Sequence, residues 1–232
     1  MKLPLRRRAV RLVVAGLGLS LALGATAVGA GTALAADPGP DPIVLVHGFR
    51  GDPSTFGEMI ARFAAQGRTA VAIDLPSEDN VVNANAIRDF IVDHGWSRVD
   101  LVGHSMGGLS ARQFVKFVAS GIVVDSYVSL GTPQYGIYSA CLLPVTYGGQ
   151  MCPSRTFLRT LNTGDDTPGA TKWMTLYSTA DEYVPNSSSR LDGGACHVKV
   201  TGVRHNDLDN NAAVFAHVLA GVDGGCTGTF VQ

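Results

Sequence analysis

Short apolar, β-branched runs alternate along the chain with stretches in which apolar residues recur at helical spacing. Six of these runs predict β-strands, at 43–46, 70–73, 99–102, 123–130, 173–178 and 197–201. After the first run, Phe56, Met59 and Phe63 follow the pattern of one helix face, and Gly67 is typical of a helix end. Strands that alternate with helices indicate an α/β fold, with a mostly parallel six-stranded sheet and helices on both faces.

Three further helices are expected along the chain. One contains Ile87 and Ile91, one covers 106–119 and is apolar on nearly all sides, and the last lies around 215–222. The remaining stretch, 131–172, is rich in Gly, Pro and Thr and offers only one short apolar helical run. We therefore expect no large lid domain.

The N-terminal segment differs in composition from the rest of the chain. Five basic residues precede an uncharged, glycine-containing apolar run at 12–30, and an Ala-Leu-Ala triplet ending at Ala35 is typical of a signal peptidase site. We expect a signal peptide at 1–35, cleavage before Ala36, and a secreted catalytic domain at 36–232. A retained membrane anchor is the less favoured alternative, because the glycines weaken a helix. The export route, Sec or twin-arginine, stays open.

Composition limits the partners of the protein. Hydrophobic residues make up 46% of the 232 residues and charged residues 16%, which is typical of a globular protein. Residues 36–232 hold 13 basic and 19 acidic residues, a net charge of −6. An acidic domain without a basic run argues against nucleic acid as a partner. No run after residue 35 is long and apolar enough for stable membrane insertion, and we expect a monomer.

Four cysteines follow the predicted cleavage site, an even number that suggests disulfides in an exported protein. Three pairings are possible, and we expect Cys141–Cys152 and Cys196–Cys226. The first would close a short loop, and the second would tie the last predicted strand to the chain end. No CxxC or Cys/His spacing of a zinc site is present, so no metal is expected.

Candidate chemistry begins with the motif formed by Gly103, Ser105 and Gly107, which ends one predicted strand and opens a helix. This is the setting of a nucleophile elbow, where small neighbours leave room for a serine in a sharp turn. A serine needs a histidine base oriented by a carboxylate. Asp181 and His205 each follow a late strand, in the order typical of the α/β-hydrolase fold. Glu182 is the alternative acid.

The reaction also needs two donors for the substrate oxyanion. The backbone N–H of Met106 at the helix start supplies one, and the N–H of Phe49, after the first strand, is expected to supply the other.

The neighbouring histidines and late acids are assigned structural roles. His104 is expected to point elsewhere in the turn, and His217 to be a packing residue on the buried side of the last helix. Asp207 and Asp209 are predicted as caps of that helix, with a calcium site as the less favoured alternative.

Five segments together resemble the small secreted bacterial lipases of the α/β-hydrolase superfamily, in the class 2 triacylglycerol lipase group. They read VHGF, GHSMGG, LGTP, STAD and GVRH, beginning at residues 46, 103, 130, 178 and 202. The resemblance runs through 43–222 and implies a minimal α/β-hydrolase fold. It implies Ser105 as nucleophile, Asp181 as acid and His205 as base, with Phe49 and Met106 as oxyanion donors. The stretch 133–170 matches no motif of the group, so the substrate preference of the group is the property that the resemblance implies least for this chain.

These observations predict a secreted serine carboxylester hydrolase of lipase type, acting on acylglycerols and other short to medium-chain esters through an acyl-enzyme. We expect a lipid or another ester as the substrate, and no cofactor, because no step needs one. A polyester hydrolase or an acyltransferase could use the same machinery. A non-catalytic binding protein with this fold is the remaining alternative, and the intact set of three residues argues against it.

Overall fold

The computed structural model describes residues 39–230. Contacts divide the chain into two units, 1–37 and 38–232, and all the described residues belong to the second. The predicted signal peptide and its cleavage site lie outside the described residues. A single sheet has the strand order β2-β1-β3-β4-β5-β6-β7. Its strands are β1 (Ile43–Val46), β2 (Ala70–Ile73), β3 (Arg98–His104), β4 (Val123–Leu130), β5 (Lys172–Ser178), β6 (Cys196–Val200) and β7 (Thr229–Phe230).

All six predicted strands are present, and neighbouring members among them are parallel. The sheet has seven strands rather than six, because β7 pairs antiparallel with β6 through Cys196 and Phe230. Strand β7 has only two residues, both exposed, and a pair this short has no hydrophobic pattern that could predict it. The Cys196–Cys226 disulfide returns the chain to β6 and places β7 beside it.

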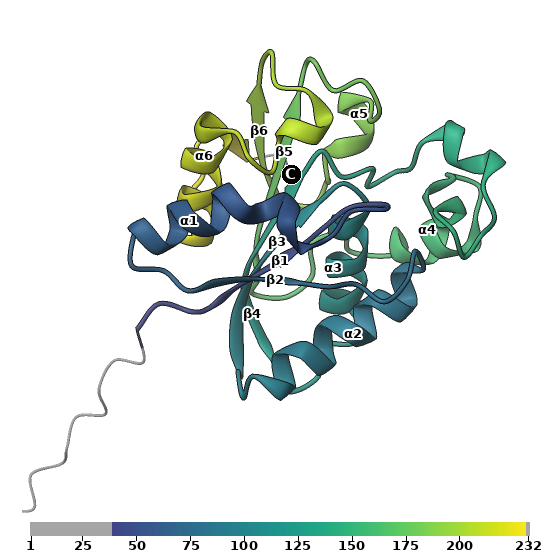
Figure 1. Ribbon diagram of the computed structural model, residues 1–232. Coiled ribbons are helices and arrows are strands. Elements are labelled where there is room, and N and C mark those ends of the chain that lie inside the picture. The colour runs from purple at the N-terminus through teal and green to yellow at the C-terminus, as the bar shows by residue number, and fades with distance from the viewer. Residues whose placement is uncertain (1–38, 231–232) are drawn as a thin grey trace, which may run out of the picture. The chain divides into compact units, whose positions relative to one another are not determined.

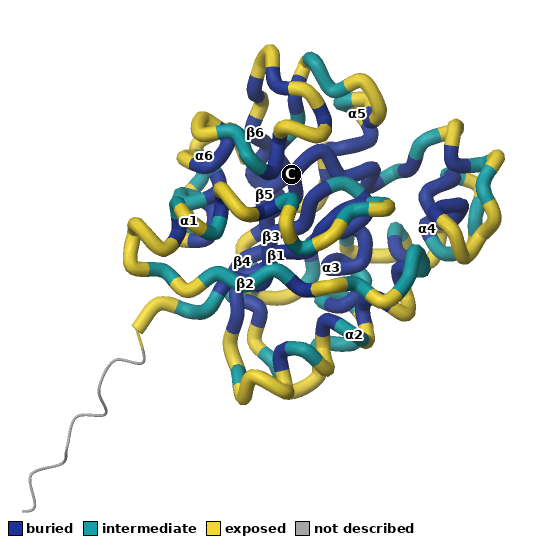
Figure 2. Tube along the Cα trace, in the orientation of Figure 1, coloured by how far each residue is buried: buried dark blue, intermediate teal, exposed yellow. Residues whose placement is uncertain are grey.

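Helices cover both faces of the sheet (Figure 1). Helices α1 (Gly57–Ala65) and α6 (Ala212–Val222) pack on one face, and α2 (Asn80–Asp93) and α3 (Met106–Phe117) on the other. Successive side chains of a strand point to opposite faces, so Leu45 joins the first core and Val44 joins the second. Figure 2 shows the central strands buried and the exposed residues gathered on helix surfaces and outer loops.

The segment between β4 and β5 forms a third, smaller core against α3. It contains η2 (Tyr138–Leu142), η3 (Gly149–Met151) and α4 (Thr156–Leu161), and the disulfide Cys141–Cys152 links η2 to the residue after η3. Its longest helix, α4, has six residues. The fold therefore agrees with the expected minimal α/β arrangement without a large lid domain.

Candidate active site

Ser105 lies in a sharp turn between β3 and α3. Its φ of 53° and ψ of −128° are unusual for a residue with a side chain. Close packing explains the two glycines, because a Cβ on Gly103 would lie 2.5 Å from the Cα of Gly108. A Cβ on Gly107 would lie 2.3 Å from the carbonyl oxygens of Val46 and His47. The elbow geometry therefore requires glycine at both positions.

The turn brings Ser105 to a histidine and a carboxylate from two later loops. The Nε2 atom of His205 lies 2.9 Å from the Ser105 hydroxyl oxygen, and its Nδ1 atom lies 2.8 Å from Oδ2 of Asp181. His205 begins η4 (His205–Asp207), after β6, and Asp181 follows β5. The carboxyl ends of parallel strands lie at one edge of the sheet. This is why Asp181 and His205, 76 and 100 positions after Ser105 in the sequence, come together beside it.

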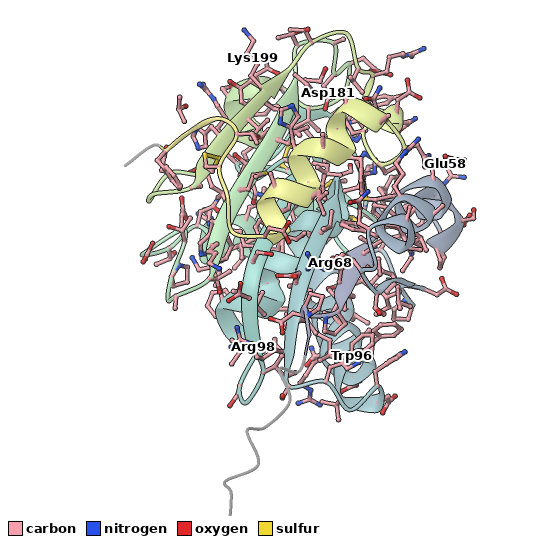
Figure 3. All side chains as sticks on the ribbon, turned by 90° about the vertical axis from the view of Figure 1, so that its left-hand side faces the viewer. Glu58, Arg68, Trp96, Arg98, Asp181 and Lys199 are labelled. Carbon is pink, nitrogen blue, oxygen red and sulfur yellow. A yellow bond between two sulfur atoms is a disulfide. The ribbon has the colours of Figure 1, made fainter. Side chains whose placement is uncertain are left out.

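Asp181 is held in a fixed orientation. Its Oδ1 accepts hydrogen bonds from the backbone N–H groups of Tyr183 at 2.9 Å and Val184 at 2.8 Å, which leaves Oδ2 for His205. The side chain is almost completely buried. Figure 3 shows Asp181 at the end of the sheet opposite Trp96 and Arg98, which lie near the start of β3.

Glu182, the alternative acid, contacts His205 through the main chain only. Its Oε2 accepts from the backbone N–H of His205 at 3.1 Å, and its Oε1 accepts from the Arg204 guanidinium at 2.9 Å. The bond from the His205 main chain lowers the pKa of Glu182. In this arrangement Asp181, and not Glu182, contacts the imidazole ring.

The loop after β1 passes directly beside Ser105. A Cβ on Gly48 would lie 2.8 Å from the Cβ of Ser105, and His47 fixes the loop by accepting from the N–H of Leu75 at 3.1 Å. In the part of the chain that the structure describes, the N–H groups of Phe49 and Met106 make no hydrogen bond. Both side chains pack into the third core. Two free donors therefore flank the serine.

The prediction that Asp207 and Asp209 cap the last helix is wrong. The cap of α6 is Asn211, whose side chain accepts from the N–H groups of Ala213 and Val214, and not Asp207 or Asp209. Asp209 is instead buried close to the site. These aspartates lie before the turn that leads into α6, so sequence distance alone could not separate them from Asn211.

His217 also differs from expectation. It is half-buried rather than packed into the core, and its Nδ1 lies 2.7 Å from the Thr227 hydroxyl. The chain end folds back over α6 and supplies this partner, which helical spacing does not reveal.

A family model described as "Alpha/beta hydrolase family" matches residues 43–219. The chain belongs to this family. Among curated proteins, the chain is 30% identical over 100 residues to ethanol acetyltransferase 1 of Wickerhamomyces anomalus. That match covers 37% of this chain and only 26% of the acetyltransferase.

Solved structures give the same fold for this alpha/beta hydrolase. Lipase B of Aspergillus fumigatus superimposes with a TM-score of 0.67 at 22% identity, over 82% of this chain and 54% of that protein. The mature lipase BlEst2 of Bacillus licheniformis gives 0.66 at 21% identity, over 80% of this chain and 93% of that one. The chain thus spans about half of the Aspergillus lipase and a quarter of the acetyltransferase.

Sequence reasoning missed two contacts around the catalytic candidates of this alpha/beta hydrolase. His104 does not simply point away, because its Nε2 lies 2.9 Å from the main-chain oxygen of His205. Asp209 lies 3.6 Å from the other ring nitrogen of His104. The histidine next to the elbow serine was the available signal, but its partner is a hundred residues away.

Metal ligation has no support among residues 39–230, where no group of three or more His, Cys, Asp or Glu side chains could hold an ion. Over the same residues, no helix combines the length and hydrophobicity that crossing a membrane requires.

Proposed function

We propose that the protein is a serine carboxylester hydrolase of lipase type, with Ser105 as nucleophile, His205 as general base and Asp181 as the orienting acid. The observation that carries this proposal is the continuous contact from Asp181 through both nitrogens of His205 to the Ser105 hydroxyl, at 2.8 and 2.9 Å. This order of groups is what activates a serine hydroxyl at neutral pH.

In the first half of the reaction, the Ser105 oxygen attacks the ester carbonyl carbon while Nε2 of His205 takes the hydroxyl proton. Asp181 holds the proton on Nδ1, so Nε2 is free to accept, and it stabilises the imidazolium that forms. The N–H groups of Phe49 and Met106 donate to the negative oxygen that develops on the substrate. Collapse of the tetrahedral species breaks the ester C–O bond, and His205 protonates the leaving alcohol.

The acyl group is then bonded to Ser105. Water attacks the acyl carbonyl, His205 removes its proton, and the same two N–H groups hold the second oxyanion. Release of the carboxylic acid returns the proton to Ser105. Every proton is carried by the chain's own residues.

An uncharged surface next to the candidate oxyanion donors supports an apolar acyl group as part of the substrate. Residues 131–154 contain no charged side chain, and four apolar or aromatic side chains in this stretch are exposed: Tyr138, Leu142, Val145 and Tyr147. The Phe49 ring packs edge-on against Tyr147, with ring centroids 5.3 Å apart, so this surface continues to the candidate oxyanion hole. We propose acylglycerols and other short to medium-chain esters as substrates, which a chain-length series of esters tests.

We further propose that the protein is secreted as a monomer after cleavage between Ala35 and Ala36. Two disulfides among the described residues are compatible with an oxidising compartment. N-terminal sequencing of the protein from the culture medium tests the cleavage position, and a mass measurement in solution tests the monomer.

Acyl transfer to an alcohol is the second candidate, because the curated relative is an ethanol acetyltransferase. The acyl-enzyme would be the same, with an alcohol replacing water in the second half. Product analysis with an ester donor in water containing ethanol distinguishes the two. A new ester as the main product favours transfer, and free acid favours hydrolysis. A polyester hydrolase would instead release soluble products from a polyester film.

The proposal is tested by labelling the full chain with a fluorophosphonate and mapping the adduct by peptide mass. We expect the label on Ser105, and Ser105→Ala should abolish both labelling and ester hydrolysis while the fold is kept. Ser120→Ala, at an exposed serine beyond α3, is the matched control and should retain both. Labelling elsewhere, or hydrolysis by Ser105→Ala, would refute the proposal.

A further inference from the structure

Every polar group of His205 has a partner. The ring nitrogens contact Asp181 and Ser105, and the backbone N–H donates to Glu182. The backbone carbonyl oxygen accepts from Nε2 of His104 at 2.9 Å, and also from the N–H of Leu208, the residue after η4, at 3.3 Å. The main chain of the candidate base is therefore held by two side chains, one from the end of β3 and one from the loop after β5.

The contact with His104 fixes the protonation of that ring. A carbonyl oxygen can only accept, so Nε2 of His104 carries a hydrogen, and Nδ1 presents a lone pair if the ring is neutral. The ring is buried and lies 4.9 Å, centroid to centroid, from the His205 ring. Burial, followed by the nearby His205, lowers the pKa of His104 to about 3, so the neutral ring is the relevant form.

Asp209 faces the lone pair of His104. Its Oδ2 lies 3.6 Å from Nδ1, longer than a hydrogen bond. Its Oδ1 is buried and has no hydrogen-bond partner among residues 39–230. An ionised carboxylate cannot donate to a neutral ring, whereas a carboxylic acid can. Burial raises the pKa of Asp209 to about 6, so below that pH the carboxylic acid is the main form and can donate to Nδ1. Asp209 is thus placed to support the orientation of His104.

We propose that His104, backed by Asp209, is a positioning residue that holds His205 through its main-chain oxygen and so fixes the distance between Nε2 of His205 and the Ser105 hydroxyl. This inference rests on the proposed function. His104 is the last residue of β3 and directly precedes Ser105, so the anchor moves with the nucleophile. A displacement of the loop that begins at His205 would otherwise change the geometry between nucleophile and base.

His104 does not take part in the chemistry itself. Its Nε2 is occupied by the His205 carbonyl oxygen, and its Nδ1 faces Asp209 rather than the Ser105 hydroxyl. The role therefore predicts an effect on turnover and on serine reactivity, with little effect on substrate affinity.

The test compares two substitutions of His104 in the full chain. In His104→Gln the amide nitrogen can occupy the place of Nε2 and keep the donor, whereas His104→Met has a similar size and no donor. Turnover of dissolved p-nitrophenyl butyrate and the rate of Ser105 labelling by a fluorophosphonate are measured on folded protein. We expect His104→Met to lower both kcat and the labelling rate about 10–100-fold with KM within about twofold, and His104→Gln to stay within about threefold of the starting protein.

His197→Met is the matched control. His197 is also buried, and its Nε2 also contacts a main-chain oxygen, that of Leu191, but it lies near the start of β6, away from the carboxyl ends of the strands. We expect this variant to lose thermal stability while the folded fraction keeps its kcat. If it lowers kcat as much as His104→Met, the effect is general destabilisation and the inference is wrong.

A second pair of variants keeps the test decisive if His104→Met does not fold. Asp209→Asn retains a donor toward His104 and should keep kcat within about threefold, whereas Asp209→Ala should lower it about tenfold. The inference is refuted if His104→Met or Asp209→Ala keeps full activity, or if His104→Gln falls as far as His104→Met. Failure of the starting protein to be labelled at Ser105 would instead refute the proposed function, so the two failures are distinguishable.

Discussion

Substituting Gly107 with alanine should damage both stability and activity, because the added methyl group meets main chain that has no room to move. The new Cβ would lie 2.3 Å from the carbonyl oxygens of Val46 and His47, whereas ordinary contacts begin at 3.4 Å. Either α3 or the end of β1 must therefore move by about 1 Å. Overpacking of this kind costs about 1–3 kcal/mol of unfolding free energy.

The same displacement reaches the candidate oxyanion hole. Phe49 follows His47 by two residues, and Met106 directly precedes the substituted position. A misplacement of about 1 Å in catalytic geometry can cost about 100-fold in rate. We expect Gly107→Ala to lower kcat/KM by about that factor and Tm by about 2–12 °C, at roughly 2–4 °C per kcal/mol for a domain of this size.

The assay measures thermal unfolding by circular dichroism and initial rates on a dissolved short-chain ester, normalised to the fluorophosphonate-reactive fraction. Gly57→Ala is the control, since Gly57 opens α1 with a φ of −52° and has open space where a Cβ would lie. That change should stabilise the protein by about 0.4–1 kcal/mol and leave the rate unchanged. A Gly107→Ala protein with unaltered Tm and kcat/KM would refute the packing argument.

Three further changes test the site and its surroundings. Asp181→Asn should lower kcat by about 10⁴, because the imidazole tautomer is lost, whereas Glu182→Gln should lower kcat far less. Steady-state kinetics that show the reverse order would identify Glu182 as the acid. The pKa of Asp209 is raised to about 6, so the folded state binds its proton more tightly than the unfolded state does. This proton binding stabilises the fold at low pH, and the stabilisation is lost as the pH rises through 6. Asp209→Asn should therefore match the starting protein near pH 4 and exceed it by about 1–3 kcal/mol at pH 8 in urea unfolding, and equal stability at both pH values would contradict this assignment. Replacing Cys141 and Cys152 together with serine should cost up to about 3 kcal/mol for the 11-residue separation, and unchanged urea midpoints would show that the loop is rigid without the disulfide.

The local pattern of the sequence determined the six parallel strands, the main helices and the position of the elbow. These features depend on residues close together in the chain: a β-branched run, a helical repeat of apolar residues, or two glycines that flank a serine. The choice of Ser105, Asp181 and His205 also followed from the sequence. Each follows a predicted strand, and parallel strands have their carboxyl ends at one edge of the sheet.

Only the tertiary structure decided which groups surround His205. The contacts of His104 and Asp209 join residues about a hundred positions apart, and Glu182 was distinguished from Asp181 by which oxygen meets the ring and which meets the main chain. Sequence spacing cannot resolve one neighbour from the next at that distance, because a difference of one residue in a loop redirects the side chain completely.

The same reason accounts for β7 and for the partner of His217. Both depend on the chain end returning to β6 and α6, where a disulfide and a few hydrogen bonds hold it. A two-residue strand has no periodicity of its own, and a half-buried histidine has the same sequence environment as a packed one. Local pattern therefore determined the elements and the candidate catalytic residues, whereas long-range packing determined how the candidate base, His205, is held.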